Sequence, residues 1–402
     1  MGPYPAVSRF KLERFNTMKQ KSLKLALSFM IGCMAVSEVN AQDVQPINVV
    51  TTAVPFLRIS PDARAGGMGE VGIATSPDVN APFWNLAKTP FNTSKFQVGL
   101  TYTPWLKRLG LNDVFLGSMS GYYKLDDDQA LSATLRYFNL GSIQFTDNLG
   151  NVFSEGRPRE WGFDVGYSRK LSEKVGLGIA LRYIHSNLAA GQTIDGNTYK
   201  AGSAVAGDLS FYYNGQNEAG NGFSAGATLT NLGSKIGYTS DATQKDFIPA
   251  NLGLGVAYTK VFDEDNKITV GMDVNKLLVP TPPNVGDSAG LVNYRNKSVV
   301  SSWFSSFGDA PGGFGEEMRE FTVSTGAEYW YQDQFALRAG YFYEDKTKGN
   351  RKYFTLGAGI RYNVFGLNFS YIVPSGSGVN QNPLSNTLRF SLVFDLDQVS
   401  GE

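Results

Sequence analysis

Short segments in which apolar and polar residues alternate recur along most of the chain. In KFQVGLTYT, residues 95–103, one side of the chain carries Phe96, Val98, Leu100 and Tyr102. Polar or small residues occupy the positions between them, and the stretches WGFDVGYSR and VGLGIALRY repeat the pattern. A period of two residues is typical of a β-strand with one apolar face and one polar face.

About fourteen such segments can be marked out, each roughly ten residues long. They lie near residues 95–103, 114–124, 130–138, 161–169, 175–186, 204–213, 222–231, 249–259, 268–278, 321–330, 335–343, 353–362, 367–373 and 386–396. An even number of antiparallel strands of this length is what a bacterial outer-membrane barrel requires. We therefore predict an all-β fold: a 14-stranded antiparallel transmembrane β-barrel over residues 95–402, preceded by an N-terminal plug or hatch segment.

The connections between the predicted strands alternate in length. One set is short, with sequences LDDDQ, KLSEK, YQDQ and NVFG, and the other is long and irregular, with 279–320 the longest. Outer-membrane barrels have short periplasmic turns and longer extracellular loops. We therefore predict a barrel in the cell outer membrane with both the N-terminus and the C-terminus on the periplasmic side.

Charged residues within the predicted strands fall opposite the apolar positions of their own strand. A lipid-facing arginine costs about 2–4 kcal/mol at the bilayer midplane, so these charges are expected in the lumen. The predicted lumen charges are Arg136, Asp164, Arg182, Asp208, Asp273, Glu328, Arg338, Arg361 and Arg389. A soluble β-sandwich would also keep charges off its apolar face, so this parity favours a barrel only together with the strand count and the loop lengths.

The N-terminal region indicates export. Residues 18–41 combine a lysine-rich start, an apolar stretch and a small-residue end, as a secretory signal peptide does. We predict cleavage between Ala41 and Gln42, with Met18 as the true start and residues 1–41 absent from the mature protein. The chain has a single cysteine, Cys33, which falls within this leader and excludes disulfides and thiol chemistry from the mature protein.

Composition supports an exported barrel and excludes some functions. The chain has 45 Gly, 27 Phe and 20 Tyr but one His. Its formal net charge is zero, so no basic footprint argues for nucleic-acid binding.

Residues 42–94, before the first strand, lack the alternation and are rich in Gly, Pro and Asn. Gly67, Gly69 and Gly72 have the spacing of a dinucleotide-binding loop, but that loop needs a strand before it and a helix after it. Pro61 and Pro77 flank these glycines and prevent both. We predict that this segment folds into the lumen as a plug, with glycines allowing close backbone contact.

The stretch FLRISPDARAGGMGEVGIATSPDVNAPFWNLA, residues 56–87, with the strands behind it, resembles the PorV (LptO) family of Bacteroidetes, within the FadL-like superfamily. The resemblance covers essentially the whole mature chain, and its specific part is this block. The hatch-motif residues are Arg64, Gly66, Gly67, Gly69, Glu70, Asp78, Trp84 and Asn85.

The resemblance implies an outer-membrane component of the type IX secretion system. Members are expected to bind the C-terminal signal domain of secreted cargo and to associate with a SprA-type translocon. They are expected to pass cargo to a PorU-type sortase, which attaches it to lipopolysaccharide. The alternative is a FadL-like channel for hydrophobic small molecules, which is weakened because Asn85-Leu86-Ala87 replaces the Asn-Pro-Ala often found in FadL-like hatches.

Catalytic and metal-binding patterns are weak. His185 is the one histidine of the predicted mature chain, and it falls on the apolar-facing parity of its strand. The acidic runs 126–128 and 263–265 lie in predicted short turns and lack a calcium-loop pattern. We therefore expect no enzyme activity, no metal and no cofactor.

The 279–320 loop contains aromatic residues in a glycine-rich sequence on the predicted outer side. Exposed aromatic residues on a long loop are candidate anchors for a partner protein. The candidate partner-binding residues are Trp303, Phe304, Phe307 and Phe314. The alternatives, that they fold back over the barrel mouth or enter the outer leaflet, stay open at this point.

Overall fold

The structure of the protein is a computed structural model that describes residues 47–146, 149–194, 197–241, 244–283, 286–374 and 384–397. The predicted signal peptide and its cleavage position, Ala41 and Gln42, lie outside the described residues. By compactness the chain divides at residue 46, and only the second unit is described below. Within the described part, no helix is long and apolar enough to cross a membrane.

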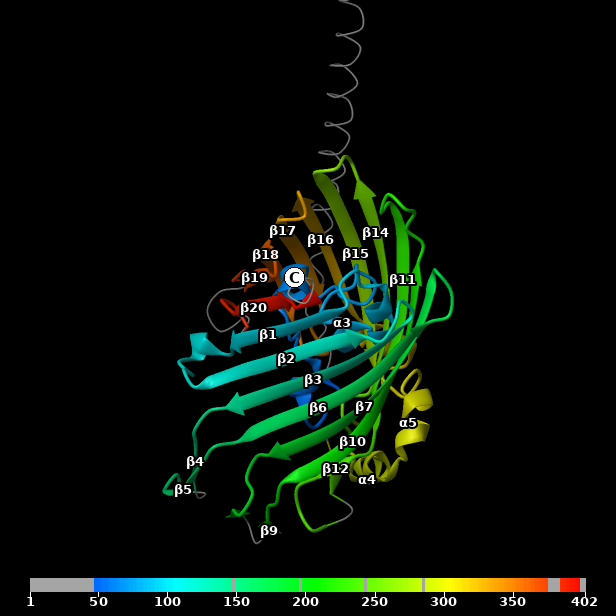
Figure 1. The fold of residues 1–402 in the computed structure, drawn as a ribbon. Coiled ribbons are helices and arrows are strands. Elements are labelled where there is room, and N and C mark those ends of the chain that lie inside the picture. The colour runs from blue at the N-terminus through cyan, green and yellow to red at the C-terminus, as the bar shows by residue number, and fades with distance from the viewer. Residues whose placement is uncertain are drawn as a thin grey trace, which may run out of the picture. The chain divides into compact units, whose positions relative to one another are not determined.

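Fourteen antiparallel strands close into a barrel, with β20 paired back to β1 (Figure 1). The predicted fold class is confirmed. The strands are β1 (Phe96–Pro104), β2 (Val114–Lys124), β3 (Gln129–Leu140), β6 (Arg159–Lys170), β7 (Val175–Asn187), β10 (Gly202–Asn214), β11 (Gly222–Gly233), β14 (Asn251–Val261), β15 (Asn266–Leu277), β16 (Thr322–Tyr331), β17 (Phe335–Tyr343), β18 (Lys352–Tyr362), β19 (Phe365–Ile372) and β20 (Leu388–Asp395).

The two faces of each strand differ as the alternation predicts. On β7, Leu177, Ile179 and Leu181 are exposed on the outer face, while Arg182 and Ser186 are buried on the inner one. A strand with apolar residues outward and polar residues inward suits a wall between lipid and a polar interior. The wall contains one register shift, between Gly207 and Leu209 of β10 opposite β11.

The long connections contain the remaining elements. They form the hairpins β4 (Ile143–Thr146) with β5 (Val152–Gly156), β8 (Thr193–Ile194) with β9 (Asn197–Thr198), and β12 (Ile236–Gly237) with β13 (Lys245–Asp246). A 3₁₀ turn, η3 (Lys107–Leu109), follows β1. Three helices, α4 (Ser288–Asn296), α5 (Val299–Ser305) and α6 (Phe314–Arg319), lie between β15 and β16. Figure 1 shows α4 and α5 at the same end of the barrel as β4, β5 and β12, which we call the long-loop end.

Residues 54–92, here called the inner segment, pack against the inward faces of the strands. They form η1 (Pro55–Arg58), α2 (Ala63–Gly67), α3 (Ala81–Trp84) and η2 (Leu86–Phe91). Asp62 caps α2 by accepting the Ala65 N–H at 2.8 Å. Phe56 and Leu57 pack against Phe138 and Ile184 on the inner face of the wall.

The first described residues, 47–53, lie among the long loops. The Asn48 N–H donates to the carbonyl of Thr347 at 3.1 Å, and the Ala53 N–H donates to that of Phe247 at 2.9 Å. The C-terminal strand ends at the opposite, short-turn end, where the Asp395 N–H donates to the carbonyl of Val364. Between residue 54 and residue 92 the inner segment therefore runs through the barrel from the long-loop end to the short-turn end, before β1 begins.

Candidate functional site

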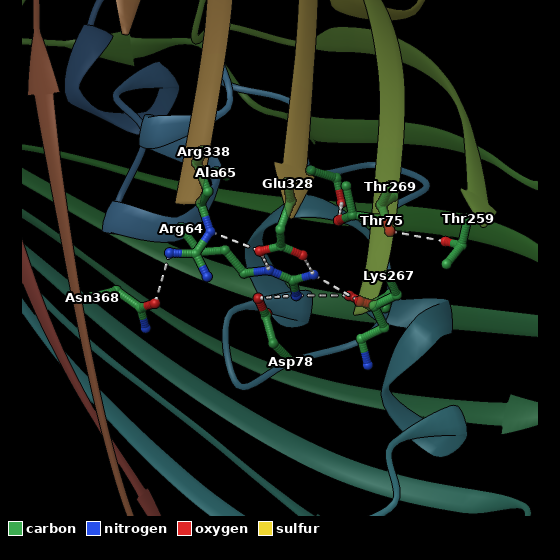
Figure 2. A network of polar contacts seen from close by, with 12 residues as sticks. Arg64, Ala65, Thr75, Asp78, Thr259, Lys267, Thr269, Glu328, Arg338 and Asn368 are labelled. Atoms are coloured by element: carbon green, nitrogen blue, oxygen red, sulfur yellow. Dashed lines mark hydrogen bonds and ion pairs between the residues drawn. The ribbon is translucent and has the colours of Figure 1, made fainter. Parts of the chain in front are cut away.

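Two buried ionic clusters occupy the barrel interior. In the first, Glu328 of β16 accepts from Arg64 of the inner segment at 2.7 and 2.9 Å and from Arg338 Nε of β17 at 2.7 Å (Figure 2). Arg64 also pairs with Asp78 at 2.8 Å, and Arg338 Nη1 donates to Asn368 at 2.9 Å. This Arg64 cluster ties α2 to β16 directly and, through Glu328 and Arg338, to β17 and β19.

The second cluster lies beside the register shift in β10. Arg182 pairs with Asp164 at 2.5 Å and with Asp208 at 2.8 Å, and it also donates to Asn231. Arg136 pairs with Asp164 at 3.2 Å. Asp208 accepts the Asn231 N–H at 2.7 Å, so the charged groups satisfy the backbone where the wall is irregular.

Arg136 of the second cluster also contacts the inner segment. It donates to the Leu57 carbonyl at 3.1 Å. Both ionic clusters therefore hold residues 54–92 against the wall.

Further contacts fix the glycine-rich part of the inner segment. Asp273 of β15 accepts the N–H groups of Gly72 and Ile73 at 2.7 and 2.9 Å. Lys88 donates to the Gly72 carbonyl at 2.5 Å. Gly69 has a φ of +69°, a conformation that favours glycine.

The remaining hatch-motif residues contact the wall or each other. Glu70 pairs with Arg389 at 3.2 Å and accepts from the Tyr353 hydroxyl at 2.8 Å. Trp84 donates to Asp62 at 2.7 Å, and Asn85 donates to the Phe211 carbonyl at 2.9 Å. The polar groups of Glu70, Trp84 and Asn85 therefore all have hydrogen-bond or ion-pair partners within the barrel.

The loop between β15 and β16 is fixed by a third ionic group, which sequence reasoning missed. Lys276 pairs with Glu317 at 3.2 Å and Glu320 at 2.6 Å. Lys348, from the loop after β17, pairs with Glu316 at 2.5 Å and Glu320 at 2.9 Å. All five side chains are buried or nearly so. We call this group the loop brace.

The braced loop presents apolar side chains to solvent. Phe304 on α5 is 76% exposed and Phe314 on α6 is 78% exposed. Phe307 is half exposed, whereas Trp303 is partly buried and its Nε1 has no hydrogen-bond partner among the described atoms. Phe304 and Phe314 are thus not buried over the barrel mouth.

The predicted lumen charges follow one pattern with one exception. All face inward and eight are buried, whereas Arg361 is exposed near the short turns, beside the ring of Trp330. His185 lies on the outer parity, with its ring 5.6 Å from that of Trp161. No group of His, Cys, Asp and Glu side chains among the described residues is arranged to hold a metal ion.

A family model described as "Type IX secretion system protein PorV" matches residues 40–284, more than half of the chain. The chain belongs to the PorV family. This PorV-family protein is therefore an outer-membrane β-barrel component of the type IX secretion system. A comparison with curated proteins found no match.

Solved structures share the fold. The Ralstonia pickettii toluene transporter TbuX is 12% identical with a TM-score of 0.50, covering 84% of this chain and 97% of that chain. The TodX deltaS2S3 mutant monoaromatic hydrocarbon channel is 12% identical with a TM-score of 0.50, covering 83% and 97%. A Pseudomonas aeruginosa FadL homologue is 14% identical with a TM-score of 0.45, covering 87% and 99%. At these identities the likeness to the first two structures shows the barrel fold alone.

Proposed function

We propose that this PorV-family barrel is a non-enzymatic docking component. It binds the C-terminal signal domain of secreted cargo, associates with a SprA-type translocon and delivers cargo to a PorU-type sortase and attachment complex. The observation that carries the proposal is the pair of exposed phenylalanines, Phe304 and Phe314, on a loop held by buried ion pairs. Exposed aromatic side chains on a rigid support are favourable anchors for a partner protein because little conformational entropy is lost on binding.

The orientation is part of the same proposal. The long-loop end, with α4, α5 and α6, faces the cell exterior, where lipopolysaccharide and attached cargo lie. The short-turn end faces the periplasm, as in other outer-membrane barrels. Residues 42–94 act as the hatch, and the contacts of residues 54–92 with the wall support this role.

A FadL-like channel for hydrophobic molecules is the alternative, and the fold of TbuX and TodX is what favours it. The interior of this barrel is less suited to that role. The cavity between the inner segment and the barrel wall is about 90 Å³. It is lined in part by Arg58, Glu70, Arg136 and Arg182. A site for an apolar ligand is expected to be larger and mostly apolar.

A loop variant tests the docking role. We expect Phe304→Ser with Phe314→Ser to leave barrel assembly unchanged but to abolish co-purification of the translocon. The matched control is Leu109→Ser, which removes a 60% exposed apolar side chain from the loop after β1. Retained co-purification in the double variant, or equal loss in the control, would count against the loop as the docking surface.

A deletion strain tests the secretion role itself. We expect cargo to remain unprocessed and unattached in the absence of this protein. Normal cargo processing together with poor growth on hydrophobic substrates would instead support the channel.

A further inference from the structure

The outer face of the wall carries an unpaired arginine at the long-loop end. Arg159 is the first residue of β6, and it lies on the same outward face as Trp161 and Phe163. Its side chain is exposed and forms no ion pair or hydrogen bond among the described residues. The neighbouring carboxylate of Glu160 is buried on the inner face, where it accepts from the Ser186 hydroxyl at 2.6 Å. Arg159 therefore has a charge that the described part of the chain does not pair.

A row of aromatic rings lies one step from Arg159 toward the short turns. Tyr137 pairs with Trp161, and Trp161 pairs with His185, so the three rings stand side by side on β3, β6 and β7. The Trp161 ring lies 5.6 Å from that of His185 and 5.4 Å from that of Tyr183. In outer-membrane barrels, aromatic residues on the outer face gather where the hydrocarbon core meets the headgroups.

The next row is apolar. Phe163 pairs with Tyr183, Tyr183 pairs with Val205, and all three side chains are exposed. Val165 and Leu181, which pair one row farther along, are exposed as well. The outer face thus changes from a cation to apolar side chains within three rows, as it should at the boundary between lipid headgroups and acyl chains.

His185 is held with one ring nitrogen free to donate. The Tyr183 hydroxyl donates to Ser203 Oγ at 3.0 Å, and Ser203 Oγ lies 3.3 Å from His185 Nδ1. Because the serine oxygen already accepts from Tyr183, its own hydrogen is available to Nδ1, which favours a neutral ring with its proton on Nε2. Arg159 pairs with Asn187, two positions beyond His185, so Arg159 and His185 are diagonal neighbours about 7–8 Å apart. Long side chains reach across that spacing, so both can donate to one anion.

The charges around Arg159 leave room for an anion. On the outer face, Arg159 is level with Asn139 on β3 and Asn187 on β7, and both are uncharged. The nearest carboxylates along these chain segments, Asp113 and Glu155, belong to the connections beyond the ends of the wall strands. A negative group at the level of Arg159 is therefore attracted by the arginine and lies farther from the carboxylates.

We propose that this sector of β3, β6, β7 and β10 binds a lipid phosphate. The phosphate accepts from the Arg159 guanidinium and from His185 Nε2, and the acyl chains lie along Phe163, Tyr183 and Val205. A lipid is the occupant because the anion site is continuous with the apolar outer face. The proposal rests on this outer face lying in lipid and does not depend on cargo docking, so either can fail without the other.

The test measures lipid binding to the purified full-length barrel in nonionic detergent by native mass spectrometry. The probe is dioleoyl phosphatidic acid, and the matched lipid is dioleoyl glycerol, which has the same chains without the phosphate. We expect the phosphate lipid to be retained at about tenfold lower concentration, the effect of one charge-assisted contact. Glycerol 3-phosphate tests the other source of the same anion. If it displaced the probe at the concentration of the probe itself, the site would belong to a free phosphate and the lipid proposal would be wrong.

Three variants locate the site. Arg159→Gln is expected to weaken retention of phosphatidic acid about tenfold and to leave that of the diacylglycerol unchanged. His185→Phe keeps an aromatic ring in the row but removes the N–H donor, so it should weaken only the phosphate lipid. The control is Arg169→Gln, which changes an exposed arginine on the same face of β6 at the short-turn end and should have no effect. Equal binding of the two lipids, unchanged binding in Arg159→Gln, or equal losses in the two arginine variants would overturn the proposal.

Discussion

At the residue scale, the glycines of RAGGMGEVGIA permit close contact within the barrel and do not form a phosphate-binding loop. A Cβ on Gly72 would lie 2.2 Å from the ring of Trp84, and Gly69 has a positive φ. The wall has matching glycines, and a Cβ on Gly340 of β17 would lie 2.1 Å from the backbone of Met68 and of Gly69. The motif and the wall are therefore complementary at the level of the backbone.

A single methyl group on this wall tests that contact. Gly340→Ala is expected to lower the free energy of unfolding by about 1–3 kcal/mol, because backbone atoms must move apart. The control is Gly117→Ala on β2, where the nearest atom to the added Cβ is 3.9 Å away. Urea-induced unfolding followed by tryptophan fluorescence measures both, and equal stability of the two variants would show that the inner segment is not seated against Gly340.

Removing one partner of the Arg64 cluster tests its ionic contacts. Arg64→Gln leaves Asp78 without its cation and Glu328 with Arg338 alone, so we expect a loss of about 3 kcal/mol. Lys267→Gln removes an ion pair with Asp333 near the surface and should cost at most about 1 kcal/mol. Comparable losses in the two variants, measured by the same unfolding experiment, would contradict a special role for the buried cluster.

Sequence reasoning could place the lumen charges on the inner face because a period of two determines the face of each strand residue. It could not pair them, since Arg64 and Glu328 are 264 positions apart. The loop brace was missed for a related reason: Lys348 and Glu320 come from connections with no alternating pattern, although Lys276 lies on β15. Asp62 lies among these inner charges, but it caps α2 and accepts from Trp84.

At the element scale, the sequence predicted the strands well and the loop helices not at all. The alternating segments near 175–186 and 335–343 match β7 and β17 closely because each strand must span the membrane. Helices α4, α5 and α6 have fewer than ten residues each and depend on tertiary contacts, such as Asp287 accepting the Gly290 N–H. Their position relative to the barrel comes from the loop brace.

The loop brace should respond to acid. Burial raises the pKa of Glu316, but hydrogen bonds and charge from Lys348 and the Gly312 N–H lower it more, so the net pKa is below its usual value. A carboxyl group with a lowered pKa in the folded state stabilises the fold above its unfolded pKa and loses that contribution as pH falls through the folded pKa. We therefore expect α6 to loosen below about pH 4.

A spin label on α6, at the exposed position Met318→Cys, measures this loosening. Its mobility should rise between pH 5 and pH 3, and the same label with Glu316→Gln should show a smaller step because the titrating group is absent. Lys276 and Glu320 remain in the brace in both proteins. An identical step in the two proteins would assign the acid response to another group.

At the scale of the whole molecule, the described residues 54–92 cross the barrel interior before the wall begins. Residues 47–53 contact Thr347, Phe247 and Pro282 at the long-loop end, and β1 starts at the short-turn end. Val50 packs in the same apolar group as Val279, Tyr294 and Val299, so this arm also supports the docking loop. The sequence alone predicts a periplasmic N-terminus because an even strand count places both ends of the barrel on one side.

The arrangement predicts which residues are reached from outside the cell. Ile47 is 76% exposed at the long-loop end, so Ile47→Cys should react with a membrane-impermeant maleimide on intact cells, as Phe304→Cys should. Asp127→Cys, in the turn after β2, should react only after the outer membrane is permeabilised. Cys33, the only native cysteine, lies in the predicted leader and should give no background. Protection of Ile47→Cys alongside labelling of Phe304→Cys would contradict the path of residues 47–53, and labelling of Asp127→Cys on intact cells would reverse the proposed orientation of the barrel.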